Sequence, residues 1–144
     1  MVDDPIKIRR GKRTDFPALL ALLPSARHTA PTKTQVRHWR RVASDLRHDF
    51  YVAEQEGVVL GMVLVCYIRT LTQERWHALL DIVVSPVNAC HIGQKLLAFA
   101  KARARKRGCR TLFAWVLDQG EQDRCLPLAQ AGFSRAGDVL SCEL

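Results

Sequence analysis

Paired cysteines and long apolar runs are both missing from this sequence. The five cysteines are scattered and include no C-x-x-C pair, which argues against a zinc site and a disulfide framework and favours a reducing compartment. No apolar run approaches the ~20 residues of a membrane-spanning helix, and the N-terminus has no signal-peptide core. We therefore expect a cytoplasmic protein with no metal site and no membrane partner.

Acidic residues are missing from one long segment. No Asp or Glu lies between Ile82 and Leu117, and the whole chain carries a net charge of +8. Two compatible interpretations stay open: cations that favour the C-terminal end of a helix, or a positive field suited to a multiply phosphorylated ligand. Nucleic acid is the less favoured partner, because the segment lacks interleaved aromatic residues and any helix-turn-helix, RRM or zinc spacing. The basic residues of this segment are Lys95, Lys101, Arg103, Arg105, Lys106, Arg107 and Arg110.

The residues that are present are typical of one globular domain spanning 1–144. An apolar fraction of 48% and a charged fraction of 25% are ordinary for such a domain. Apolar periodicity switches between strand and helix spacing along the chain, in the order βααββ-βαβαβ. This order predicts an α/β (α+β) fold with a single mixed sheet and helices on both faces. The expected strands are 6–10, 50–54, 58–68, 76–84, 111–117 and 139–143, and the expected helices are 14–23, 34–46, 92–107 and 121–131.

The strand 58–68 is almost wholly apolar, so we expect it to be central and covered on both faces. Gly61 lies inside this strand. A glycine within a strand suggests a bulge or a close approach of another backbone.

The stretch from Val84 to Leu97 joins a buried strand to a helix through a short loop. Ser85 and Pro86 stop the strand, since proline has no N–H to donate to a neighbouring strand. We expect the helix to open at Ile92 and Gly93. The first turn of a helix presents free N–H groups and the positive end of the helix dipole, so this corner is suited to a phosphate.

The order of these residues resembles the cofactor-binding signature of the GNAT acetyltransferase superfamily, V-x-P-x-(Q/R)-x-x-G-x-(G/A)-x-x-L-(L/I). Val84, Pro86, Gly93 and the pair Leu96–Leu97 match it. Asn88 replaces the Gln or Arg of the signature, and His91 replaces its first glycine. Near the C-terminus, Gly132–Phe133 resembles the late L-Y-x-x-x-G-F motif of the superfamily, with Leu128 at the tyrosine position.

The resemblance implies that the chain binds acetyl-CoA and an amine acceptor, without a metal. The acetyl-pantetheine arm would enter between the parallel strands that contain Leu79–Val84 and Leu112–Leu117. The strand backbone would meet that arm, and the loop that follows would hold the pyrophosphate. The residues implied in this binding are Ile82, Val83 and Val84 of the strand, and Ala89, Cys90, His91, Ile92, Gly93, Gln94 and Lys95 of the loop.

The candidates for catalysis come from the strand before the loop. Asp81 is the one carboxylate in an otherwise apolar strand, where burial would raise its pKa toward the range of a useful general base. A structural hydrogen bond or an exposed position on the strand is the alternative for Asp81. His77, at the start of the strand, is the second candidate, followed by Glu74. No acid is identified, because Leu128 cannot donate a proton and the Cys125 thiol is a poor substitute.

Two functions of different class follow. The first is an N-acetyltransferase that transfers an acetyl group from acetyl-CoA to an amine of a small molecule or protein. The alternative, favoured by His91 and Leu128, is a GNAT-fold module that binds CoA or a partner protein with weak or lost catalysis. The acceptor is left open, although His28 lies in a loop that shapes the acceptor pocket in this superfamily. Trp39 and Trp76 fit either the core or a homodimer interface.

Overall fold

The computed structural model describes residues 5–23, 30–114, 128–137 and 139–144. The chain order is strand, short 3-10 turn, two helices, three strands, a long helix and a strand. The helices are η1 (Arg13–Asp15), α1 (Pro17–Leu22), α2 (Lys33–Ser44) and α3 (Ala89–Lys106). The strands are β1 (Lys7–Arg10), β2 (His48–Gln55), β3 (Val58–Ile68), β4 (Trp76–Val84) and β5 (Cys109–Ala114).

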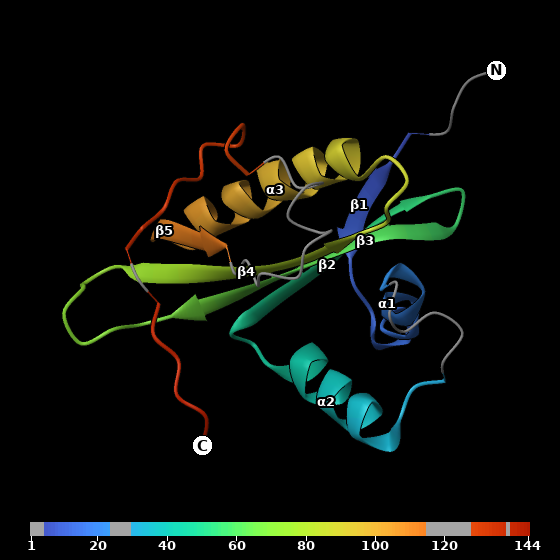
Figure 1. Ribbon diagram of the computed structural model, residues 1–144, viewed down its shortest axis with the longest axis horizontal. Coiled ribbons are helices and arrows are strands. Elements are labelled where there is room, and N and C mark those ends of the chain that lie inside the picture. The colour runs from blue at the N-terminus through green and yellow to red at the C-terminus, as the bar shows by residue number, and fades with distance from the viewer. Residues whose placement is uncertain (1–4, 24–29, 115–127, 138) are drawn as a thin grey trace.

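The strands form one mixed sheet in the order β1-β2-β3-β4-β5. The first three pairings are antiparallel, and β4 pairs with β5 in parallel. A parallel pair needs a crossover, and α3 supplies it between Val84 and Cys109. Figure 1 shows α3 along one face of the sheet, with α1 and α2 on the other side. The predicted mixed sheet with helices on both faces is therefore confirmed.

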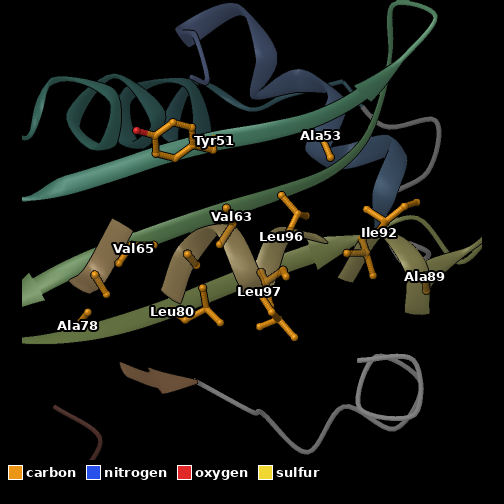
Figure 2. Close-up of a cluster of buried hydrophobic side chains, with 14 of the residues drawn as sticks. Tyr51, Ala53, Val63, Val65, Ala78, Leu80, Ala89, Ile92, Leu96 and Leu97 are labelled. Atoms are coloured by element: carbon orange, nitrogen blue, oxygen red, sulfur yellow. The ribbon is translucent and has the colours of Figure 1, made fainter. Parts of the chain in front are cut away.

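The main core lies between α3 and the sheet. Alternate residues of β2, β3 and β4 point toward α3, as the two-residue period of a strand requires. Leu96 and Leu97 of α3 are fully buried among them, together with Val63 and Leu80 (Figure 2). Packing along the whole length of α3 thus fixes both ends of this helix relative to β4.

The opposite face of the sheet carries two smaller clusters. Leu22 of α1 packs on Val52 and Met62. Phe16 stacks between Trp39 of α2 and Phe50 of β2, with ring centroids 5.7 and 4.5 Å apart. Trp39 is therefore a core residue.

Gly61 confirms the first alternative that its position in the strand predicted, a bulge, and the nearest atoms to it are helix side chains. The β2–β3 register shifts between Ala53 and Glu54, directly opposite Gly61, which marks an irregularity in the ladder. A Cβ at Gly61 would lie 2.8 Å from Leu96 Cδ1 and 3.0 Å from Ile92 Cγ2, so the helix approaches the strand closely here.

Most element ends that the structure describes lie within two residues of those expected, but two predictions differ more. Helix α3 begins at Ala89, three residues before the expected start, because Asn88 turns the chain with φ of 58° and ψ of 30° and the helix follows at once. The prediction of a final strand over 139–143 was wrong. These residues join no strand of the described sheet, and Val139 and Leu140 are 81% and 92% exposed, so neither pairing nor burial favours an extended strand there.

Residues 121–127 of the predicted helix 121–131 lie outside the described part, and residues 128–132 form hydrogen-bonded turns. The Gly132 N–H donates to the Ala129 carbonyl at 3.1 Å, and the Phe133 N–H donates to the Leu128 carbonyl at 3.0 Å. With Gly132 at a φ of 90°, this pattern is the Schellman motif that terminates helices. Residues 115–117 of the expected strand 111–117 also lie outside the described part.

Candidate functional site

The first turn of α3 offers backbone N–H donors at the C-terminal end of β4. Asn88 occupies the N-cap position in a left-handed conformation, and its side chain accepts no capping hydrogen bond. No acidic side chain lies in this first turn. Within the described residues, no side chain occupies these N–H groups at the positive end of the helix dipole, a geometry that suits an anion.

The residues expected to hold the pyrophosphate divide into two sets, because they form the start of a helix and not a loop. Ala89, Ile92 and Gly93 are buried against the sheet, so they contribute only backbone groups. Cys90, His91, Gln94 and Lys95 are exposed. The His91 side chain thus points to solvent at the helix start.

The C-terminal half of β4 is paired on one side only within the described residues. On one edge, Val84 to His77 pair with Gly61 to Ile68 of β3 over the whole strand. On the other edge, the described pairing with β5 ends at Leu80 opposite Ala114. Backbone groups of Asp81, Ile82, Val83 and Val84 on that edge lie beyond this pairing. The Ile82 and Val84 side chains are buried toward α3, and those of Asp81 and Val83 point to the opposite face.

Asp81 lies on the sheet face away from α3 and is exposed. It is directly opposite Leu64 of β3, and Cys66 is the next residue of β3 on the same face. Partial desolvation raises the pKa of the Asp81 carboxyl above its ordinary value. Contact with solvent limits that rise. Burial, followed by the charges of Asp81 and Asp45, raises the pKa of the Cys66 thiol, which keeps it protonated.

His77 shares this face with Asp81 but does not form a pair with it. Four residues of strand separate them by about 13 Å. The His77 ring lies 5.9 Å from the Phe113 ring, and its Nδ1 is buried without a hydrogen-bond partner among the described residues. An open cavity of about 530 Å³ adjoins it. The cavity is lined by Ile68, Thr70, Thr72, Gln73, His77, Arg110, Thr111 and Phe113.

Other residues singled out in the sequence have mixed outcomes. Glu74 is exposed in the β3–β4 connection, away from any described cluster. Leu128 and Phe133 pack against the main core. His28 and Cys125 lie outside the described residues.

The basic segment has a structural role that the sequence did not predict. Arg103 and Arg107, near the C-terminal end of α3, both contact Asp49 of β2, at 3.4 and 3.2 Å. Lys101 donates to the Ala131 carbonyl at 2.7 Å. These three cations therefore stabilise the fold through contacts within the protein. One sequence signal could have revealed these ion pairs: Asp49 is an aspartate at the start of a largely apolar strand, where a buried carboxylate needs a cationic partner.

Neither a metal-binding cluster nor a membrane-spanning helix occurs among the described residues. No three His, Cys, Asp or Glu side chains among them gather closely enough to hold a metal ion. None of the helices in the described part is both long and apolar enough to cross a membrane.

The chain resembles several solved structures over nearly its whole length. It is 22% identical to a transcriptional regulator from Bacillus halodurans C-125, with a TM-score of 0.83 over 97% of this chain and 100% of that one. It is 17% identical to glucosamine-6-phosphate N-acetyltransferase from Arabidopsis thaliana, with a TM-score of 0.74 over 97% and 99%. It is 14% identical to the aminoglycoside N-acetyltransferase AAC(6')-Iy, solved in complex with CoA, with a TM-score of 0.78 over 99% and 97%. At these identities the likeness shows a shared fold.

The family assignment depends on the sequence and not on the fold alone. A search of curated proteins found no match. The family model for the acetyltransferase (GNAT) family matches residues 14–133, which include β4, the uncapped start of α3 and the late Gly132–Phe133 pair. This match covers well over half of the chain, and the fold agrees with it. The chain therefore belongs to the GNAT acetyltransferase family.

Proposed function

We propose that this protein is an N-acetyltransferase that transfers the acetyl group of acetyl-CoA to an amine of a small molecule or protein. The observation that carries the proposal is the position of Asp81. Its side chain is exposed on the face of β4 away from α3, in the stretch of that strand beyond the described β5 pairing. The anion-accepting start of α3 follows the same strand after four residues.

The residues present fit acetyl-CoA. The thioester of bound acetyl-CoA supplies an activated acetyl group. The α3 N–H groups that no side chain caps would hold the pyrophosphate, with Gln94 and Lys95 beside them. Backbone N–H groups of Ile82 to Val84, on the edge of β4 beyond its described pairing with β5, would orient the arm and polarise the carbonyl. Positioning the acetyl group beside the amine supplies most of the rate enhancement.

Asp81 would act as the general base. An amine attacks only when neutral, so a proton must leave the ammonium form of the acceptor. The carboxylate of Asp81 accepts that proton, directly or through water, and the thiolate of CoA leaves and takes a proton from solvent. Because the pKa of Asp81 is raised, its carboxylate is a stronger base than an ordinary aspartate.

The test is CoA titration followed by acetyl transfer to a panel of amines, for the wild type and for Asp81→Asn. We expect Asp81→Asn to keep CoA affinity and to lower the transfer rate by about 10²- to 10⁴-fold. The wild-type rate should fall as pH decreases through the raised pKa of Asp81, and the variant should lack this dependence. Glu143→Gln is the matched control, because it removes one carboxylate from the exposed C-terminal residues.

The second candidate is a CoA-binding module with weak or lost catalysis. It is favoured by Leu128, which stands at the tyrosine position of the late motif and packs into the core, so that it supplies no acid for the thiolate. CoA binding without turnover on any amine would support the module and contradict the enzyme. Failure to bind CoA would contradict both.

A further inference from the structure

A small cavity lies on the α3 side of the sheet, near the C-terminal end of that helix. Its volume is about 140 Å³, and its walls are Arg47, Tyr67, Trp76 and Arg107. We call it the arginine cavity. Two guanidinium groups and two aromatic rings therefore surround a space large enough for one small chemical group.

Both arginines of the wall are held in place by other side chains. Arg107 Nη2 lies 3.2 Å from Asp49 Oδ1, and its guanidinium carbon lies 4.9 Å from the centre of the Tyr67 ring. Arg47 binds Asp45 through two parallel contacts, Nε to Oδ1 at 3.1 Å and Nη2 to Oδ2 at 2.9 Å. Guanidinium groups fixed in this way lose little conformational freedom when they bind a further anion.

The surroundings of the arginine cavity carry excess positive charge. Arg10 and Arg103 also contact Asp49, at 3.5 and 3.4 Å, and Arg69 lies over the Trp76 ring at 4.0 Å. Four guanidinium groups thus contact the two carboxylates of Asp45 and Asp49, and a fifth, that of Arg69, lies over the Trp76 ring of the cavity wall. These five arginines exceed the two aspartates by three positive charges. The Asp49 side chain is fully buried.

We propose that the arginine cavity binds the phosphomonoester group of a small metabolite. A planar guanidinium presents a fork of donors that matches two oxygens of a phosphate. The volume fits one such group, and two guanidinium groups, those of Arg47 and Arg107, line the same cavity. Duplex nucleic acid would instead require a stripe of cations along the surface.

This site is separate from the proposed acetyl-CoA site, and the proposal does not rest on acetyl transfer. Helix α3 has 18 residues, so its two ends lie about 27 Å apart. The proposed pyrophosphate position is at the N-terminal end of α3, and the arginine cavity is near its C-terminal end. One phosphate group cannot occupy both.

The test is calorimetric titration of the full chain with inorganic phosphate and with AMP, at constant ionic strength kept with sodium chloride. We expect saturable binding of both. Arg47→Gln should weaken it by about tenfold or more, the effect of losing a charge-assisted hydrogen bond. The Arg47 side chain is 75% exposed, so this variant should fold. Arg107→Lys should also weaken binding, because it keeps the charge and loses the fork.

The matched control is Arg105→Gln, which removes the same charge from an exposed position in the last turn of α3, outside the cavity wall. It should change phosphate affinity by less than about twofold, as screened charges do. Equal weakening by Arg47→Gln and Arg105→Gln would mean non-specific attraction and would overturn the proposal. So would displacement of phosphate by saturating dephospho-CoA, which keeps the pyrophosphate but has no phosphomonoester, or heats that never saturate. Tighter binding of AMP than of phosphate, lost in Arg47→Gln, would identify a phosphorylated metabolite as the source. Equal affinities would identify free phosphate as sufficient.

Discussion

At the scale of single residues, Asp49 is the most constrained side chain. Its carboxyl is fully buried and accepts a 2.6 Å hydrogen bond from the Tyr67 hydroxyl, besides its contacts with Arg103 and Arg107. Burial alone would raise the pKa of Asp49, but the Tyr67 hydrogen bond and the arginine charges outweigh it and lower the pKa below its ordinary value. Burial and the same hydrogen bond raise the pKa of Tyr67. The pair therefore stays as a phenol donating to a carboxylate.

Asp49→Asn should destabilise the fold by about 3–5 kcal/mol at pH 7, because it leaves the guanidinium groups of Arg10, Arg103 and Arg107 without their carboxylate. Since the folded-state pKa is lowered, the contribution of Asp49 is fully present above the unfolded pKa of about 4 and is lost as pH falls through the folded value. Urea denaturation of both proteins between pH 7 and pH 2 measures this. The difference should shrink toward pH 2, and a difference that stays constant with pH would contradict the role given to the charge.

At the scale of elements, the contact between α3 and β3 sets how deeply the helix sits on the sheet. Gly61 has no side chain, so Leu96 and Ile92 reach the backbone of β3 there. A Cβ would also lie 3.3 Å from the Val83 carbonyl oxygen of β4. Three elements thus meet at one glycine, and the start of α3 is positioned by that contact.

Gly61→Ala should destabilise the protein by about 1–3 kcal/mol through overpacking. The clash is mainly with Leu96, so Leu96→Ala in the same chain should relieve part of it. The double variant should then cost less than the sum of the two single variants, as measured by a thermodynamic cycle of denaturation free energies. Strict additivity would mean that the backbone shifts instead, and that the contact does not limit the approach of the helix.

At the scale of the whole molecule, α3 joins the antiparallel part of the sheet to the parallel strand. It connects β4 to β5 and supplies much of the main core, so the position of β5 depends on it. Removing packing from α3 should therefore weaken the whole fold at once.

Leu97→Ala should destabilise the protein by about 2–5 kcal/mol, because the side chain is fully buried and its loss leaves a cavity. Leu71→Ala makes the same chemical change at a fully exposed position of the β3–β4 connection, and it should stay within about 0.5 kcal/mol of the wild type. Thermal denaturation of the two variants provides the comparison. Similar losses in both would contradict the assignment of the core.

Local patterns predicted most of the fold. Alternation in β2 to β4, the Pro86 stop and the leucine pair of α3 are properties of neighbouring residues, so the sequence reveals them. The start of α3 was misplaced because a left-handed Asn88 leaves no periodic signal. The strand over 139–143 was wrongly predicted because strand pairing depends on a distant partner.

The candidate site was predictable in part. Its β4 residues and the uncapped start of α3 follow from the resemblance to the family and from chain order. The burial of Asp49 and the arginine cavity did not, because they bring together residues from β2, β3, β4 and α3 that are far apart in the chain. No pattern among neighbouring residues predicts that such distant residues lie together in the fold.

The cluster around Asp49 also restricts how this chain can change over time. Asp49, Tyr67, Arg103 and Arg107 satisfy one another, so replacing any one leaves a partner with an unmatched charge or hydrogen bond. A neutral core at this place is reachable only if several of the four positions change together. Among close relatives, we therefore expect these four positions to covary, while Arg105 on the same helix turn varies independently.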